Sequence, residues 1–186
     1  MKDQRTGYGE VWTPKKLSRL KKKELMDIWH SLPAPAFSEM DGEYEAEILD
    51  QGPVTSLLSR AVLYMPVLHG TWLGKAFTPA GKSEGHGYNA FRSLGRVRRK
   101  YRMKTQVAPS TFDGRDAFTL IYDAYDSLCG MIHMRDEVRK VADGLYLGVG
   151  TWGFTDGMRQ KNLPFVLSGP VGPFTGSDRE EAKQAE

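Results

Sequence analysis

The sequence predicts a mainly β protein: an antiparallel β-barrel or half-barrel preceded by an amphipathic helix. Two observations lead to this fold class. Beyond Phe37, short runs of strand-forming residues alternate with glycines at turn-like intervals, and many short antiparallel strands in one chain favour a meander that curls into a barrel. Before that point, apolar residues recur at helical spacing between Thr13 and Pro33. A length of 186 residues is ordinary for one domain.

The predicted helix has clear ends. Thr13 is a suitable N-cap, and Pro14 fits the first turn of a helix. Pro33 and Pro35 end it, because proline lacks a backbone donor and disfavours helix in the residue before it. The apolar side consists of Leu17, Leu20, Leu25, Ile28, Trp29 and Leu32. Basic residues occupy the other side, so we expect the helix to lie on a core or over the mouth of a cavity.

The remaining elements follow from local pattern. We expect strands at residues 42–49, 70–77, 97–105, 117–124, 131–141, 145–154 and 165–167. Residues 57–63 are assigned to a second short helix, and residues 78–90, which are polar and rich in glycine, to a loop. Residues 1–12 form an N-terminal extension, residues 13–175 the barrel domain with its helix, and residues 176–186 a flexible tail.

Composition narrows the class of protein. The chain has 26 Lys and Arg against 23 Asp and Glu, a net charge of +3, and no apolar run of about 18 residues that would span a membrane. The N-terminus is polar and lacks the pattern of a secretory signal. A single cysteine, Cys129, excludes an internal disulfide and fits a reducing compartment, so we expect a cytoplasmic protein. Its 8 Met, 8 Phe, 8 Tyr and 4 Trp supply an adaptable apolar interior.

A run of cations between residues 92 and 104 suggests a nucleic-acid interface. The run contains Arg92, Arg96, Arg98, Arg99, Lys100, Arg102 and Lys104. Strand alternation offers a simpler interpretation. The even positions from 98 to 104 share one face of the predicted strand, and this face would be a solvated outer surface. Arg99 falls on the opposite face, and an inward arginine usually pairs with a carboxylate or an anionic ligand. Nucleic acid is the less favoured partner, since the net charge is only +3.

His133 is the candidate acid or base. A histidine beside methionines on a pocket-lining strand can act as a general acid or base near neutral pH. Tyr122, Asp123 and Asp126 lie shortly before it and would meet it across a hairpin. Such a set can enolise or isomerise an apolar carbonyl compound, with Tyr122 or Arg99 polarising an oxygen. The same residues can equally form the polar end of a binding pocket, and a histidine hydrogen-bonded to a neighbouring strand is the commoner outcome.

We expect neither a metal nor an organic cofactor. The four histidines are scattered without metal-ligand spacing, and the sequence has no Cys-x-x-Cys, phosphate-binding loop or Gly-x-Ser-x-Gly turn. Cys129 has small and apolar neighbours in the sequence, which is typical of a buried, inert thiol.

Several segments, in order, resemble one family. Residues 24–33 (ELMDIWHSLP) and 38–46 (SEMDGEYEA) are similar to the opening of the GXWXG family, in which a short helix ending in Leu-Pro precedes a Gly-x-Trp-x-Gly strand. Tyr44 stands for the tryptophan and Ala46 for the second glycine, so that motif is only partly met. Residues 72–77 (WLGKAF) match the family's Trp-x-Gly-Lys-x-Phe element more closely.

The later part of the chain resembles the partner domain that commonly follows this element. The similarity lies at residues 120–123 and 138–148, so that it covers about residues 24–168 in all. It implies a lipocalin-like barrel with a helix near one end, and it implies no catalytic residue. Extra residues around 126–135 depart from the family pattern, and His133 lies among them. The family-typical positions are Trp72, Gly74, Lys75, Phe77, Tyr122, Asp123, Arg139 and Gly148.

A small barrel either packs solid or holds one small ligand. The sequence favours a shape-tolerant pocket for a small apolar molecule: a terpenoid, steroid, polyketide or fatty acyl compound. Its predicted wall consists of Trp72, Phe77, Arg99, Tyr101, Met103, Met131 and Trp152.

Two functional hypotheses stay open. One is a cofactor-free isomerase, cyclase or lyase that uses His133, Asp123, Asp126 and Tyr122, and the other is a non-catalytic lipocalin-like carrier. A basic nucleic-acid-binding module is a less favoured third hypothesis, and a homodimer is compatible with each.

Overall fold

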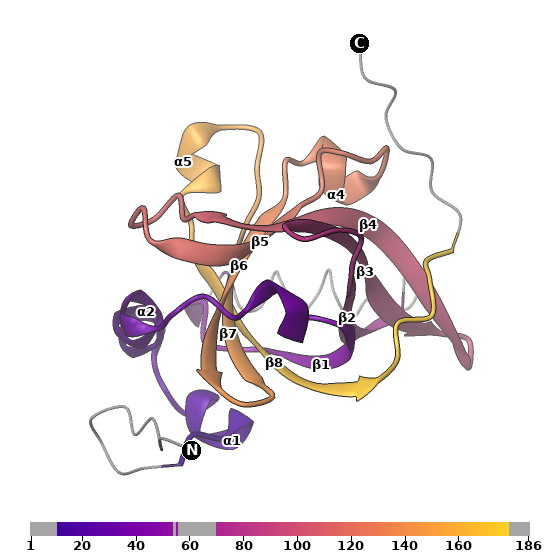
Figure 1. Cartoon of the computed structure of the whole chain (residues 1–186). Helices are drawn as coiled ribbons and strands as arrows, with labels where there is room; N and C mark the ends of the chain where they lie inside the picture. The colour runs from indigo at the N-terminus through magenta and orange to yellow at the C-terminus, as the bar shows by residue number, and fades with distance from the viewer. Residues whose placement is uncertain (1–10, 54, 56–69, 179–186) are drawn as a thin grey trace.

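The protein is a closed β-barrel. The computed structural model describes residues 11–53, 55 and 70–178, and in them eight antiparallel strands pair in sequence order, with β8 returning to β1. Figure 1 shows the strands wrapped around a central axis. The strands are β1 (Gly42–Ile48), β2 (Thr71–Pro79), β3 (Glu84–Ser93), β4 (Arg96–Pro109), β5 (Asp116–Ile121), β6 (Arg135–Ala142), β7 (Leu145–Thr151) and β8 (Leu163–Gly172). The predicted antiparallel, lipocalin-like barrel is therefore confirmed, in its closed form.

The N-terminal helix is broken in two, where a single helix was predicted. Helix α1 (Pro14–Leu17) is capped by Thr13 as expected, and α2 (Lys22–Ser31) follows after a turn. The break occurs because side chains take the first backbone donors of α2. Glu24 accepts from the Lys21 N–H at 2.8 Å, and Asp50 accepts from the Lys22 N–H at 3.0 Å. Apolar periodicity cannot reveal a cap from Asp50, which lies far along the chain.

Several short helices complete the described elements. They are η1 (Phe37–Glu39), α4 (Leu128–Met131) and α5 (Asp156–Arg159). None of the helices in this part of the chain has the length and apolar character of a bilayer-spanning segment. The helix predicted at residues 57–63 lies outside the described residues.

The predicted loop at residues 78–90 is wrong, because most of it forms β3. Its glycines serve close strand packing: a Cβ at Gly87 would collide with the carbonyl oxygen of Ala76 on β2. Asn89 and Phe91 face the barrel interior, whereas Tyr88 and Ala90 pack outside it. The side chains of this polar, glycine-rich segment therefore alternate between the two faces of the sheet, as in any other strand.

The predicted inward position of Arg99 is also wrong. Gly87 pairs with Met103 and Asn89 with Lys100, so β4 carries one extra residue there, and Tyr101 adopts a left-handed backbone with φ of 58°. This β-bulge reverses the alternation. Arg99 pairs with Ala90 on the outer face, and its Nε lies 3.2 Å from Glu43 Oε1.

The bulge also changes the predicted solvated face of β4. Met103 remains inside. Arg98 and Lys100, by contrast, pair with Phe91 and Asn89, so they share the side of the sheet that those residues occupy.

The strand predicted at residues 131–141 begins only at Arg135. Ser127 caps α4, its Oγ accepting from the Gly130 N–H at 3.2 Å, and this short helix takes up residues that a strand would need. His133 then lies in a turn with φ of 50°. Likewise β7 ends at Thr151, and Trp152 lies beyond it rather than in the strand predicted at 145–154.

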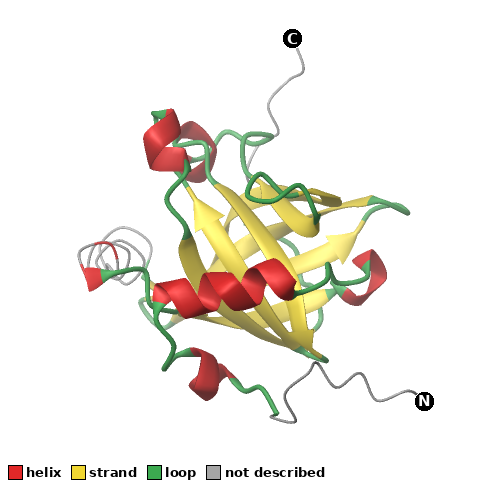
Figure 2. Ribbon diagram, turned by 90° about the vertical axis from the view of Figure 1, so that its left-hand side faces the viewer, coloured by secondary structure: helices red, strands yellow, loops and turns green. Residues whose placement is uncertain are grey.

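Helix α2 lies across the outer surface of the barrel (Figure 2). Trp29 and Leu25 are fully buried against strand residues such as Leu147 and Val166. At the centre of this contact is Arg139 of β6, which is fully buried, with its guanidinium 3.9 Å from the Trp29 ring centroid. A second apolar cluster thus covers the outside of the sheet, distinct from the one inside the barrel.

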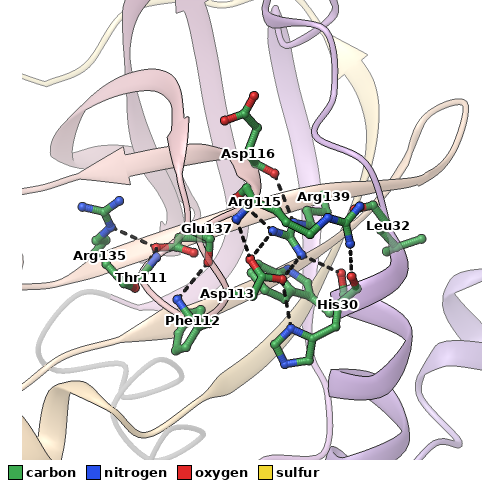
Figure 3. A network of polar contacts seen from close by, with 12 residues as sticks. His30, Leu32, Thr111, Phe112, Asp113, Arg115, Asp116, Arg135, Glu137 and Arg139 are labelled. Carbon is green, nitrogen blue, oxygen red and sulfur yellow. Dashed lines mark hydrogen bonds and ion pairs between the residues drawn. The ribbon is translucent and has the colours of Figure 1, made fainter.

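Arg139 joins three segments through hydrogen bonds (Figure 3). Its two terminal nitrogens donate to the carboxylate of Asp113 at 2.7 Å each, and one also donates to the Trp29 carbonyl at 3.1 Å. These bonds from Arg139 hold the pKa of Asp113 well below its usual range, and His30 contributes in the same direction. The ion pair therefore ties α2 and the β4–β5 loop to the barrel wall.

We expect the Asp113→Asn variant to lose about 3 kcal/mol of unfolding free energy at pH 7, because it leaves the Arg139 guanidinium buried without its carboxylate. A carboxyl with a lowered folded-state pKa stabilises the fold above its unfolded pKa of about 4, and this contribution is lost as the pH falls. The wild type should therefore lose its advantage over the variant in acid, which urea denaturation at several pH values measures.

Asp143→Asn is the matched control. Asp143 also pairs with a cation, Lys140, but it is almost fully exposed. We expect little change in stability from this substitution. Equal stability of Asp113→Asn and the wild type at pH 7 would contradict the role given to Arg139.

Candidate functional site

Five polar side chains meet inside the apolar barrel. They are Trp72 and Lys75 of β2, Asn89 of β3, Tyr122 directly after β5, and Asp136 of β6. All are buried, with Lys75 exposed by only 3% and Asp136 by 1%. Charged side chains are rarely buried unless they are paired, so this group is the most unusual feature of the interior.

A β-bulge places two of these residues together. Trp72 pairs with Phe91 and Lys75 with Asn89, so four residues of β2 match three of β3. Both Trp72 and Lys75 therefore point inward, although strict alternation would put them on opposite faces. Gly74 permits this geometry, because a Cβ there would collide with the carbonyl oxygen of Tyr44 on β1.

Lys75 uses all three of its donors. Its Nζ lies 2.6 Å from the Tyr122 hydroxyl, 2.8 Å from Asp136 Oδ2 and 2.9 Å from Asn89 Oδ1. The rings of Trp72, Tyr122 and Phe165 each have their centroid 5.4 Å from the same nitrogen. The ammonium is thus held between a carboxylate, two oxygen acceptors and aromatic faces.

Tyr122 connects the cation to the carboxylate. Its hydroxyl donates to Asp136 Oδ2 at 3.0 Å and accepts from Asn89 Nδ2 at 3.0 Å as well as from Lys75. Burial, and next the negative charge of Asp136, raise the pKa of Tyr122 well above its usual value. The phenol therefore stays protonated and acts as a hydrogen-bond donor.

Trp72 orients the amide of the group. Its Nε1 donates to Asn89 Oδ1 at 3.2 Å, which directs the Asn89 Nδ2 toward the tyrosine hydroxyl. In chemical terms the site offers a cation, a protonated phenol and a carboxylate base within hydrogen-bond distance of one another. Such a set can bind and polarise a carbonyl or carboxyl oxygen and can move a proton.

The surroundings of this group are apolar and adaptable. The interior cluster includes two buried methionines, Met40 and Met103, and Met134 packs against its edge. Aromatic side chains supply much of the remainder: Tyr44, Phe77, Phe91, Phe118, Tyr146 and Phe165. Methionine has three rotatable bonds and fills irregular space, so these side chains can rearrange around a guest molecule.

The predicted pocket wall divides into two sets. Trp72, Phe77 and Met103 are buried inside the barrel, and Tyr101 packs against the same cluster. Tyr122, predicted as a catalytic residue, lies at the centre of the polar group. The others lie outside the interior cluster: Arg99 on the outer face, Met131 at 63% exposure and Trp152 at 36%.

His133 and Asp123 come together, but outside the barrel. His133 Nδ1 lies 3.5 Å from Asp123 Oδ2, and both side chains are about half exposed. They line an open groove of about 540 Å³ on the outer side of the sheet, together with Arg135, Arg159 and other residues. Asp126 is exposed in the next turn. The predicted catalytic set is therefore split, with Tyr122 inside and the other three residues at the surface.

Sequence reasoning missed Lys75, Asn89 and Asp136 as members of one site. A signal existed for Lys75, because it is the single charge within the apolar run of residues 70–77. Asn89 lies in a segment that was assigned to a loop, so strand alternation was not used to predict where its side chain points. Within the described part of the chain, no group of three or more His, Cys, Asp or Glu is placed to hold a metal ion.

Comparisons with known proteins bear on the fold. The chain matches no protein-family model and no curated protein. Among solved structures, a protein from Thermomonospora curvata has a similar crystal structure, with a TM-score of 0.55 and 19% sequence identity over 80% of this chain and 87% of that one. At this identity the likeness shows a shared fold alone.

Removing the charge of Lys75 while keeping that of Asp136 should destabilise the fold. We expect Lys75→Met to lose about 3–5 kcal/mol of unfolding free energy at pH 7, because Asp136 is left as a buried carboxylate without its counter-ion. An unpaired buried carboxylate destabilises a fold only in its charged form. The defect should therefore be smaller at pH 5 than at pH 8.

The double variant Lys75→Met/Asp136→Asn is the control for this prediction. It removes both charges, so it should recover most of the lost stability and lose the pH dependence. Guanidinium denaturation at the two pH values measures all three proteins. A single variant as stable as the double variant at pH 8 would show that the two groups are not an ion pair.

Proposed function

We propose that the barrel binds a small, largely apolar molecule that carries a carbonyl or carboxyl oxygen, and that Tyr122 and Lys75 hold this oxygen. One observation carries the proposal: a cation, a phenol, an amide and a carboxylate converge in an interior otherwise lined by methionine and aromatic residues. The candidate ligands are terpenoids, steroids, polyketides and fatty acyl compounds.

The stability of the fold alone does not explain why Lys75 and Asp136 are buried as an ion pair. Desolvating a lysine and an aspartate costs several kcal/mol per ion, and their mutual attraction often only offsets this cost. A pair of apolar residues would serve a solid core as well. The interior of an eight-stranded barrel is just wide enough for side chains to fill it or for one small ligand to occupy it. A ligand oxygen can replace Asn89 or Asp136 as a partner of Lys75 without leaving the ammonium unpaired.

Entry of a ligand requires side chains to move, because side chains occupy the interior. Met134 both packs against the interior cluster and lines the outer groove that contains His133. A change of its rotamer would connect the two spaces. Met40 and Met103 provide further room for adjustment.

The catalytic form of the proposal is an isomerase that shifts a double bond or a stereocentre next to a carbonyl. Asp136 would take a proton from the carbon beside the carbonyl, while Tyr122 and Lys75 stabilise the negative charge that develops on the oxygen. Return of a proton to another carbon moves the double bond, and its return to the opposite face of the same carbon inverts the stereocentre, so no cofactor is consumed in either case. In the alternative form, a non-catalytic carrier, the same contacts only hold the ligand.

The resemblance to the GXWXG family remains part of this proposal. Support comes from residues 72–77, since the glycine and lysine of that element form the bulge and the cation of the site. A cytoplasmic location is likewise proposed, on the basis of the single cysteine.

Native mass spectrometry of the freshly purified protein tests ligand binding directly. We expect a co-purified apolar molecule that is released on denaturation. Tyr122→Phe keeps the ring but removes the hydroxyl, so the affinity for this molecule should fall about tenfold. Tyr88→Phe is the matched control, because Tyr88 is equally buried but its hydroxyl contacts Glu43 outside the barrel. An equal loss in both variants, or no ligand in either, would contradict the proposed site.

Solvent-deuterium exchange separates the catalytic form from the carrier. With a bound carbonyl ligand, the wild type should incorporate deuterium at the carbon beside the carbonyl, as followed by NMR. Asp136→Asn should bind the ligand but reduce this exchange at least a hundredfold. His133→Ala should leave the rate unchanged, since that imidazole lies in the outer groove. Loss of exchange in His133→Ala alone would move the chemistry to the groove, and ligand binding without exchange in the wild type would identify a carrier.

A further inference from the structure

The turn between β3 and β4 presents a leucine to solvent. Leu94 is 100% exposed, and it is followed by Gly95 in a two-residue connection from Ser93 to Arg96. Both turn residues are left-handed, with φ of 49° for Leu94 and 75° for Gly95. This type of hairpin turn favours Asn-Gly or Asp-Gly, whereas a leucine is strained in it.

Leu94 is therefore unfavourable in two ways within the isolated molecule. Its backbone conformation suits asparagine better, and its apolar side chain lies fully in water. The next apolar residue on β4, Val97, is also exposed, at 40%. A side chain that contributes nothing to the fold and lies at the tip of a hairpin is well placed to contact a partner.

Cations surround this apolar tip. Arg92, Arg96, Arg98 and Lys100 lie within six residues of Leu94, and no acidic residue occurs between Glu84 and Asp113. Three other cations of the run have partners: Arg99 pairs with Glu43, Lys104 pairs with Glu84, and Arg102 lies over the Tyr125 ring. Within the described parts of the chain, the four cations beside the tip form no ion pair with an acidic side chain.

We infer that the β3–β4 hairpin docks the barrel on an anionic membrane surface, with Leu94 inserted among the lipid chains and the four cations against the headgroups. The combination of an apolar tip with flanking arginines matches an interface in which an apolar layer lies beneath negative charge. Nucleic acid fits less well, because the hairpin aromatics Phe91 and Tyr101 contact each other edge to face, with ring centroids 5.6 Å apart, and pack with the interior cluster rather than presenting free faces to a base.

The position of the hairpin in the barrel agrees with this inference. Because successive strands alternate in direction, the β3–β4, β5–β6 and β7–β8 connections lie at the same end of the barrel. The other two connections also expose large apolar side chains there, with Met131 at 63% and Phe154 at 66%. The inference does not depend on the proposed ligand site, since it concerns residues beside the β3–β4 turn at one end of the barrel.

Co-sedimentation of the full chain with lipid vesicles tests this inference. Vesicles of phosphatidylcholine alone are compared with vesicles of equal parts phosphatidylcholine and phosphatidylglycerol. We expect binding to the anionic vesicles, weakened by salt, and little binding to the neutral ones. Leu94→Asn should bind the anionic vesicles about tenfold more weakly. Its thermal stability should be equal to that of the wild type or higher, because asparagine suits the left-handed turn.

Matched controls come from the opposite end of the barrel. Val171→Asn removes an apolar side chain that is 60% exposed, and it should leave vesicle binding unchanged. Arg96→Gln/Arg98→Gln should weaken binding by more than tenfold, about fivefold per cation, whereas Lys82→Gln in the β2–β3 turn should not.

Three results would overturn the inference. The first is equal binding by Leu94→Asn and the wild type, and the second is equal binding to neutral and anionic vesicles. The third is tighter binding to single-stranded RNA than to anionic vesicles, together with displacement from the vesicles by that RNA. This last result would identify the hairpin as a nucleic-acid interface.

Discussion

The close approach of β1 and β2 at Gly74 decides what the barrel contains. At this point the chain has no room for a side chain, because a Cβ would occupy the space of the Tyr44 carbonyl oxygen. The resulting bulge turns Lys75 inward beside Trp72 instead of outward into water. Once the ammonium is inside, the interior must supply acceptors for three donors. Asn89, Tyr122 and Asp136 are those acceptors, so the polar site follows from one steric constraint on the backbone.

Two buried ion pairs hold different parts of this molecule, and they have different physical roles. The Arg139–Asp113 pair lies outside the barrel and joins α2, the β4–β5 loop and β6, so its geometry explains how the N-terminal segment is held on the sheet. The Lys75–Asp136 pair lies inside and joins strands that are already fixed by their backbone hydrogen bonds. Its contribution to the fold is therefore replaceable, and its chemistry is the better explanation for its presence.

Much of the architecture could be predicted from the sequence, because it depends on local periodicity. The alternation of apolar residues and the spacing of glycines predict the antiparallel barrel. The predicted wall residues Trp72, Phe77 and Met103 do lie inside, although Trp72 and Phe77 share the inner face only because of the bulge between them. Errors arose where the period is interrupted. The extra residue at Tyr101 reversed the direction of Arg99, and the bulge at Gly74 brought Lys75 to the face of Trp72. Such interruptions depend on the neighbouring strand, which periodicity within one strand cannot reveal.

The candidate site was harder to predict than the fold for a related reason. His133 and Asp123 are close in sequence and do meet, yet the short helix α4 takes up residues between them, and they lie on the outer surface. Asp136 is only three residues further along but lies inside, beyond the turn at His133. His133 and Asp136 are thus close in sequence, and they differ in the direction in which their side chains point relative to the barrel wall.

Closure of the barrel explains how one small domain can hold both a charged interior and an apolar tip. Because β8 pairs with β1, the barrel has no free sheet edge, and each strand is paired on both sides. A second apolar cluster under α2 adds stability outside the sheet, with Trp29, Leu25 and Leu147 fully buried. Apolar clusters on both sides of the closed sheet thus stabilise the fold. The interior can then retain a lysine and an aspartate, and the β3–β4 turn can retain a strained leucine, without loss of the fold.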